Sequence, residues 1–200
     1  MSRTILHITC SPMGDKSFTR KLTTELLAKL KAQHSDSVVV TRDLDANPLP
    51  HIDGATLGAF FTPPEKRDAK LAEAIKLSDR VVQELLAADI VVIAAPMWNF
   101  GIPSVLKAWI DHVVRAGLTF RYTANGSEGL IPAGHKVIIV SARGGMYSDG
   151  PAKHLDHQET YLQVVLGFMG LKDIAFIRAE GVAMGEDSVW GSGCSMRCLC

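Results

Sequence analysis

Short apolar segments that have the character of buried strands recur along the chain and alternate with segments of helical period. The clearest of them, residues 89–95, reads Asp-Ile-Val-Val-Ile-Ala-Ala, as expected for a strand covered on both faces of a parallel sheet. Four further segments have strand character and span residues 4–9, 37–44, 136–141 and 172–179. Five strands with helices between them predict a doubly wound α/β domain, in which helices cover both faces of a five-stranded parallel sheet.

Apolar residues spaced three or four apart predict the helices between these strands. The stripes lie within residues 18–30, 71–85, 103–114 and 161–168, and Pro103 suits the first turn of the third helix. Residues 51–66 show no period, so we expect a long loop there with at most one helical turn. Residues 119–130 are expected to form a hairpin that turns at Asn125-Gly126.

Charge and hydropathy narrow the class of protein. Lys and Arg number 21, and Asp and Glu also number 21, so the formal net charge is zero. This balance argues against a nucleic-acid binder and against polybasic attraction to a membrane. The first apolar run is too short for a signal peptide, and no run reaches the roughly 18 apolar residues of a membrane helix. We therefore expect a cytoplasmic protein.

The end of the chain differs in composition from the rest. We place one domain at residues 1–185 and an atypical tail at residues 186–200, which is rich in Gly, Ser and Cys and lacks a helical period. The tail is expected to be partly disordered. Its three cysteines, Cys194, Cys198 and Cys200, form no disulfide framework. A zinc site there would lack a fourth ligand at a suitable spacing, so we expect no metal.

Three loops follow strands of the predicted sheet and should meet at its carboxyl edge, where doubly wound sheets bind ligands. The first, residues 10–19, leads into a helix with Ser17 and Thr19 in its first turn. Free N–H groups at a helix start hold phosphate, although Ser17 is also explained as an ordinary helix cap. Because the usual ATP and dinucleotide fingerprints are missing, a single phosphate from a mononucleotide such as FMN fits better.

The other two loops suit a flat ring. The second, residues 96–103, places Trp98, Asn99 and Phe100 between prolines, as a ring system with a few edge hydrogen bonds would require. The alternative is a tight turn that buries both aromatic side chains in the core. The third loop combines Arg143 with two glycines, which let the backbone approach a ligand. Here the alternative for Arg143 is a surface ion pair.

Several motifs together resemble the FMN-dependent NADH:azoreductase family, which is part of the flavodoxin-like NAD(P)H:quinone oxidoreductases. They are Pro-Met-Trp-Asn-Phe at 96–100, Arg-Ala-Gly-Leu-Thr-Phe-Arg-Tyr-Thr at 115–123, Asn-Gly at 125–126, Glu-Gly-Leu at 128–130 and Arg-Gly-Gly at 143–145, supported by Arg-Asp-Leu at 42–44, Asn-Pro at 47–48 and Ala-Glu-Gly at 179–181. The resemblance covers the chain from the first strand to about residue 185. It implies a flavodoxin-like fold and a homodimer with one FMN per subunit at the interface.

The resemblance also implies which residues hold FMN. The expected contacts are Ser11, Ser17, Phe18, Thr19, Met97, Trp98, Asn99, Phe100, Ala142, Arg143, Gly144 and Gly145. Two of these depart from the family pattern. Phe18 stands where a polar residue is usual, so its side chain is not expected to bond the phosphate. Trp98 stands where Tyr is also common, which preserves a stacking role. The tail departs as well, because the family fold closes with an amphipathic helix.

By this resemblance the protein would pass hydride from NADH or NADPH to azo compounds and quinones, with the chemistry at flavin N5. The alternative within this class is a quinone reductase with only incidental azo activity. No side chain is assigned a catalytic role, and the charge of Arg143 would support the reduced flavin. Trp98 and Phe100 would shape a substrate slot beside the flavin. Phe120, and Phe60 or Phe61 across the dimer, would help to form it. A single slot holds one ring at a time, so ping-pong kinetics are expected.

Two other classes of protein stay open on the sequence alone. One is a flavodoxin-like electron carrier, although such carriers are usually strongly acidic; the other is a cofactor-free interaction module of the same fold. His154-Leu155-Asp156-His157 is interpreted as a solvated helix start and not a metal site. Cys10 could be a reactive thiol of low pKa, but a small buried residue is the favoured interpretation.

Overall fold

Five parallel strands form the central sheet of the computed structural model, which describes residues 2–184. They are β1 (Thr4–Thr9), β2 (Val38–Asp43), β3 (Ile90–Pro96), β6 (Lys136–Ala142) and β7 (Asp173–Ala179), in the spatial order β2-β1-β3-β6-β7. All four pairings are parallel, which confirms the predicted fold class. The chain reverses its direction across the sheet between β1 and β3, so a ligand cleft is expected at the carboxyl ends of these strands.

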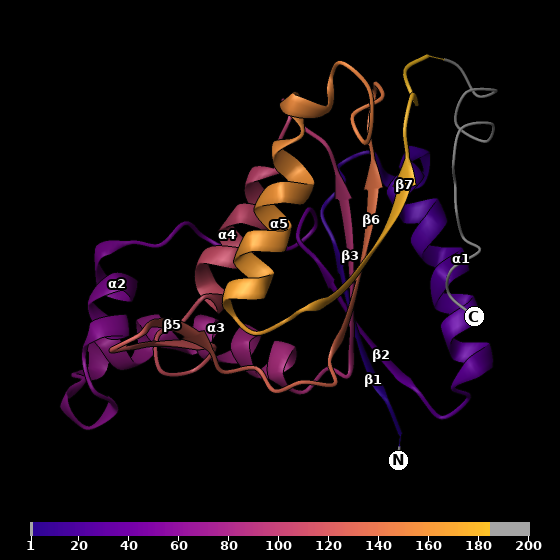
Figure 1. Ribbon diagram of the computed structural model, residues 1–200. Helices are drawn as coiled ribbons and strands as arrows, with labels where there is room; N and C mark the ends of the chain where they lie inside the picture. Colours follow the sequence, from indigo (N-terminus) through magenta and orange to yellow (C-terminus); the bar gives the residue numbers. More distant parts are fainter. Residues whose placement is uncertain (1, 185–200) are drawn as a thin grey trace.

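Helices cover both faces of the sheet (Figure 1). α1 (Phe18–Gln33) lies on one face, where Leu22, Leu26 and Leu30 pack against Ile5 and Val92. α3 (Ala69–Leu86), α4 (Ser104–Val113) and α5 (His157–Phe168) bury their apolar sides on the other face. The buried run of β3 belongs to both cores, because successive side chains of a strand point to opposite faces.

The segment between β2 and α3 contains more helix than the sequence analysis predicted. α2 (Gly54–Phe61) is eight residues long, and a 3-10 turn (Pro64–Lys66) follows it. The Asp53 side chain caps α2 by accepting a hydrogen bond from the Thr56 amide at 2.7 Å. The expectation of a loop with at most one helical turn is therefore wrong, because the cap and packing against α3 stabilise a helix that shows no clear sequence period.

Two helix details also differ from the prediction. Pro103 is the N-cap of α4, which begins at Ser104. In α5 the predicted stripe is displaced, because Leu162 and Leu166 enter the core while Val164 is 72% exposed. No helix within residues 2–184 is long and apolar enough to cross a membrane. The predicted tail at residues 186–200, with its three cysteines, lies outside the described residues.

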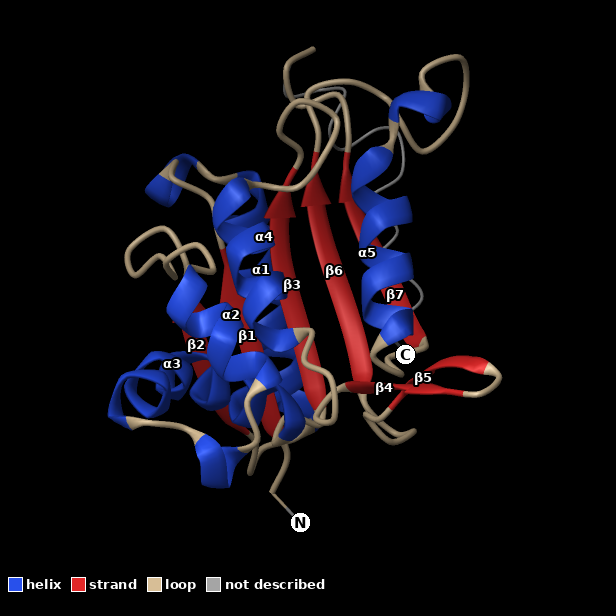
Figure 2. Ribbon diagram, turned by 90° about the vertical axis from the view of Figure 1, so that its left-hand side faces the viewer, coloured by secondary structure: helices blue, strands red, loops and turns tan. Residues whose placement is uncertain are grey.

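The predicted hairpin is present as β4 (Phe120–Thr123) and β5 (Gly126–Gly129), which pair antiparallel. Figure 2 shows it at the end of the sheet opposite the strand arrowheads. Its base lies directly against the end of α5, since a Cβ on Gly129 would come within 2.2 Å of the Gly170 backbone nitrogen. The hairpin is therefore far from the carboxyl edge of the five-stranded sheet in the same chain.

Candidate functional site

The start of α1 presents hydrogen-bond donors beside buried hydroxyls. The Ser17 hydroxyl accepts from the Arg20 amide at 3.2 Å and lies 3.0 Å from the Thr19 hydroxyl, which confirms its capping role. Ser11, Ser17 and Thr19 are all buried. Within the described residues the amides of Phe18 and Thr19 have no partner, as is usual for the first turn of a helix. Such an end fits a phosphate, and the cap does not exclude it, because only the Arg20 amide is used.

Phe18 contributes its backbone and not its side chain to this end of the helix. Its ring is half-buried and packs against the core beneath α1. The expectation that this side chain does not bond a phosphate agrees with that packing. The donor set of the first loop thus consists of amides and hydroxyls.

The loop after β3 is a strained tight turn. Trp98 and Gly101 exchange two backbone hydrogen bonds of 3.0 and 2.9 Å, and between them Asn99 has φ 48° and Phe100 has φ 69°. Asn often adopts this left-handed conformation, whereas for Phe it is unfavourable by about 1–2 kcal/mol. Trp98 is 50% exposed and Phe100 43%, so the alternative of a turn that buries both rings in the core is wrong. Backbone strain held beside exposed aromatic rings makes this turn a candidate functional site.

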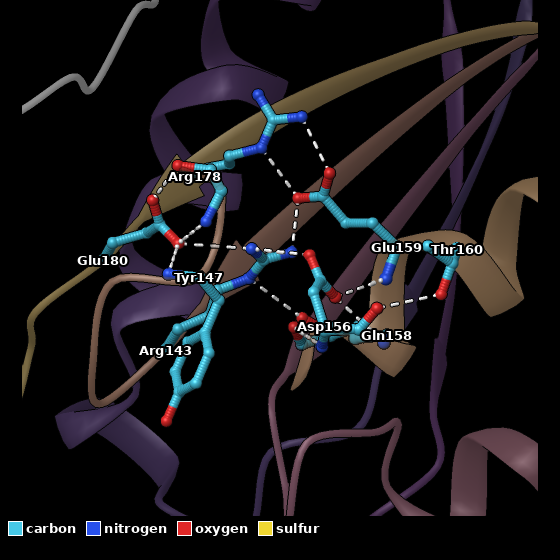
Figure 3. Close-up of polar contacts among 10 residues, drawn as sticks. Arg143, Tyr147, Asp156, Gln158, Glu159, Thr160, Arg178 and Glu180 are labelled. Carbon is cyan, nitrogen blue, oxygen red and sulfur yellow. Dashed lines mark hydrogen bonds and ion pairs between the residues drawn. The ribbon is translucent and has the colours of Figure 1, made fainter. Parts of the chain in front are cut away.

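Arg143, at the end of β6, is completely buried in a cluster of carboxylates (Figure 3). Its guanidinium pairs with Asp156 at 3.0 Å, with Glu180 at 3.2 Å and with Glu159, and its Nε donates to Gln158 at 3.3 Å. Arg143 is therefore no surface ion pair. It also offers no free cation to a ligand, so its predicted electrostatic support of a reduced flavin is corrected: its charge is matched inside the protein.

The carboxylates of this cluster come from the start of α5 and the end of β7. Asp156 caps α5 by accepting from the Gln158 and Glu159 amides, each at 3.0 Å, so the expected solvated helix start is wrong at this residue. Glu159 also pairs with both ends of the Arg178 guanidinium at 2.7 Å. The cluster thus contains two arginines and three carboxylates. The sequence analysis missed its acidic members, although Asp156 and Glu180 both fall in segments that it quoted.

In the third loop the backbone carbonyls accept hydrogen bonds, whereas some of the backbone amides have no acceptor among the described residues. The carbonyls of Arg143, Gly144 and Gly145 accept from residues 181–183, and the Arg143 amide donates to Ala179 at 2.8 Å. In the described part of the chain, the amides of Gly144 and Gly145 have no acceptor. They are donors available to the carbonyl edge of a ring ligand. Ala142 lies just before them and is buried.

Tyr147 adds an aromatic ring that the sequence analysis did not select. Its ring meets Phe100 edge to face, with centroids 6.1 Å apart and planes at 77°. The position directly after Gly-Gly-Met in the third loop was the available signal. This contact joins the second loop to the third.

Further contacts bring the three loops together. The Met97 amide donates to the Ala142 carbonyl at 2.8 Å, which links the second loop to the third. A cavity of about 360 Å³ lies between the first loop and the second, lined by Cys10, Pro12, Asp45, Trp98, Asn99, Ile102, Pro103, Ser104 and Val105. The predicted meeting of the loops at the carboxyl edge is therefore confirmed, with unpaired amides on each of them.

Comparison with known proteins agrees with this arrangement. Residues 3–190 match a protein family described as having a flavodoxin-like fold. The FMN-dependent NADH:quinone oxidoreductase of Herminiimonas arsenicoxydans is 56% identical over 92% of this chain and 90% of its own length. A protein of the same name from Nostoc sp. is 49% identical over 92% and 89%. The chain belongs to this oxidoreductase family.

Solved structures with the same fold include azoreductases. The azoreductase of Bacillus anthracis str. Sterne is 32% identical, with a TM-score of 0.86 over 94% of this chain and 91% of that one. An FMN-dependent NADH-azoreductase of Bacillus anthracis str. Ames Ancestor, solved with FMN, is 26% identical, with a TM-score of 0.84 over 92% and 90%. The resemblance inferred from the sequence motifs is thereby confirmed.

Of the three phenylalanines expected at the substrate slot, Phe120 lies elsewhere in this flavodoxin-like oxidoreductase, whereas Phe60 and Phe61 are expected from the partner of a dimer. Phe120 is buried in the hairpin base, with its ring centroid 4.5 Å from that of Phe168 at the far end of α5. The Arg115 guanidinium covers the Phe60 ring at 4.1 Å, and Phe61 is 79% exposed beside a groove of about 490 Å³. Phe120 therefore does not line the slot of its own chain, because the hairpin is anchored at the amino edge of the sheet.

Cys10 is a buried structural residue in this oxidoreductase. Its thiol donates to the Ala94 carbonyl at 3.1 Å, and burial raises its pKa to about 12. The alternative of a reactive thiol is wrong, since the thiolate is disfavoured at neutral pH. Among residues 2–184 no group of three or more potential ligands is placed to hold a metal ion.

Proposed function

We propose that this chain binds FMN at the three loops and uses NADH, or NADPH in its place, to reduce quinones and azo compounds in two-electron steps. The observation that carries the proposal is the strained turn at Asn99 and Phe100, which presents exposed aromatic rings next to unpaired amides. The names of the relatives support both the cofactor and the substrates.

The available donors fit FMN at both of its ends. Ser11, Ser17 and the amides of Phe18 and Thr19 would hold the phosphate at the start of α1. Within the segments 97–100 and 142–145, four backbone amides have no acceptor among the described residues and would bond the edge of the ring: those of Asn99, Phe100, Gly144 and Gly145. When bound, FMN would supply the site that takes hydride from NADH and delivers it to the acceptor.

The side chains of the chain position the reactants and do no covalent chemistry. Trp98, Phe100 and Tyr147 provide aromatic surface for a planar ring. We infer that this surface holds either the nicotinamide or the acceptor, so that the two bind in turn. The Cys10 thiol is protonated and buried, so it forms no intermediate. Water in the open slot would supply protons to the reduced acceptor.

A homodimer is part of the proposal. An apolar groove of about 570 Å³ runs between α4 and α5, lined by Gly101, Ile102, Lys107, His157, Thr160, Tyr161 and Val164. Exposed apolar surface of this kind is typical of an interface between subunits. In a dimer, Phe60 and Phe61 would be able to approach the cleft of the partner, whereas Phe120 is buried in its own chain.

Steady-state kinetics on the purified protein test this proposal. The protein is expected to bind one FMN per chain and to oxidise NADH with a quinone or an azo dye, without any partner protein. Turnover that requires a protein partner would instead indicate an electron carrier. Double-reciprocal plots at several acceptor concentrations should give parallel lines. Intersecting lines would show simultaneous binding and contradict a single slot.

A further inference from the structure

The Glu180 carboxylate accepts hydrogen bonds from four donor groups, although Glu180 lies outside the three loops. Its Oε1 accepts from the Tyr147 amide at 2.7 Å and from the Ser148 amide at 2.8 Å, and it also pairs with Arg143 at 3.2 Å. Its Oε2 accepts from the Ser148 hydroxyl. The carboxylate is buried, and Figure 3 shows it between Arg143 and the Tyr147 backbone.

The charge of Glu180 is not needed to neutralise the arginines. Arg143 and Arg178 are already matched in number by Asp156 and Glu159, with which they pair directly. Glu180 is the surplus carboxylate of the cluster. Burying a surplus charge is unfavourable unless donors compensate it, so its presence needs another explanation. The donors that Glu180 alone satisfies are those of Tyr147 and Ser148.

The loop after β6 needs hydrogen bonds of this kind to hold its conformation. Gly144 and Gly145 give its backbone unusual freedom, and loops rich in glycine hold one shape only when other contacts fix them. Of the donors at Tyr147 and Ser148, the structure pairs both amides and the hydroxyl with Glu180. These bonds also hold Tyr147 at the place where its ring meets Phe100.

We propose that Glu180 is a positioning residue for the cofactor site: it fixes residues 143–148, so that the unpaired Gly144 and Gly145 amides and the Tyr147 ring are held ready for a ligand. This inference rests on the proposed FMN site. The pKa of Glu180 agrees with it: burial alone would raise that pKa, yet the bonds from Ser148 and Tyr147, with the charge of Arg143, lower it overall. The carboxylate therefore stays ionised and keeps accepting from the loop.

Glu180→Gln is the direct test, because it keeps the shape and leaves the other four charges balanced. FMN binding to the apoprotein is followed by quenching of flavin fluorescence, and hydrogen exchange is followed at the Tyr147 and Ser148 amides. We expect the Kd for FMN to rise at least tenfold and exchange at the two amides to accelerate at least tenfold, with exchange in β3 unchanged. A role in overall stability alone would accelerate exchange in β3 as well.

Glu84→Gln is the matched control. Glu84 is also a carboxylate that pairs with an arginine: it is partly buried and bonded twice by Arg42, but it lies on α3 and contacts none of the loops. The Kd for FMN should stay within twofold in this variant. Ser148→Ala removes one donor and should give a smaller rise than Glu180→Gln; it serves as the test if Glu180→Gln does not fold.

The proposal is overturned if Glu180→Gln binds FMN like the wild type, or if Glu84→Gln weakens binding equally. In the case that only Ser148→Ala folds, unchanged FMN binding and exchange in that variant would overturn it. If the wild-type apoprotein binds no FMN, the proposed function fails. Accelerated exchange confined to Tyr147 and Ser148 would then still show that Glu180 holds the loop, and unchanged exchange would overturn that too.

Discussion

The carbonyl of Phe100 accepts a hydrogen bond from the amide of His157 at 3.0 Å. This bond ties the strained turn after β3 to the first residue of α5. The residue just before His157 is Asp156, which caps the same helix and pairs with Arg143. The start of α5 therefore fixes the second and third loops together, and the geometry of one loop depends on the other.

Replacing Phe100 separates its backbone strain from its ring. Phe100→Asn and Phe100→Leu both remove the aromatic ring, but Asn adopts the left-handed conformation more readily. We expect Phe100→Asn to be more stable than Phe100→Leu by about 1 kcal/mol. Both variants should raise the KM for a quinone. Urea unfolding and steady-state kinetics measure the two effects, and equal stabilities would show that the turn is unstrained.

Loss of Arg143 should destabilise the whole protein. Arg143→Ala leaves three buried carboxylates without their shared cation, an imbalance that typically costs about 3–5 kcal/mol. Arg178→Ala is the comparison, because Arg178 is 36% exposed and contacts one of these carboxylates, and it should lose about 1 kcal/mol or less. Chemical denaturation of both variants measures this, and similar losses would contradict the central role of Arg143.

Buried histidines should make stability depend on pH. Burial lowers the pKa of His7 and of His112, so the folded state keeps both neutral where the unfolded chain takes up protons. The free energy of unfolding should therefore be highest above the ordinary pKa of about 6.5 and fall as the pH decreases below it.

The slope for each histidine is at most about 1.4 kcal/mol per pH unit. Denaturation between pH 7.5 and 5.5 measures this slope, and the window avoids most carboxylate titration. His112→Gln should reduce the slope, because the glutamine side chain does not titrate. Its amide can still donate to the Pro50 carbonyl, which His112 contacts at 3.0 Å. A flat profile for the wild type would contradict the prediction.

A charge on α5 should dissociate the proposed dimer. Val164 is largely exposed and lines the apolar groove between α4 and α5. Val164→Glu would place a carboxylate in that interface, so light scattering should show a monomer at micromolar concentration. Val38→Glu is the control, because Val38 is also exposed but lies on the edge strand β2, and it should leave the dimer intact. A dimeric Val164→Glu variant would place the interface elsewhere.

Local sequence patterns predicted most of the helices and strands and the three loops that form the candidate site. The five strands begin and end within one residue of their predicted positions, because long buried β-branched runs have few alternatives. Ser17 was recognised as a cap from its place before a helical stripe. α2 was missed, because its apolar sequence carries no period and its helix depends on Asp53 and on packing against α3.

The sequence by itself determined the order of strands and helices, the carboxyl-edge loops and the family to which the chain belongs. These follow from residue types and spacings that act over a few neighbours or match a motif directly. Only the tertiary structure decided that Arg143 is buried among Asp156, Glu159 and Glu180, that Tyr147 meets Phe100, and that Phe120 lies at the far edge of the sheet. The physical reason is that burial and charge pairing depend on which distant segments pack together, and residues 143, 159 and 180 come together only when β6, α5 and β7 are side by side.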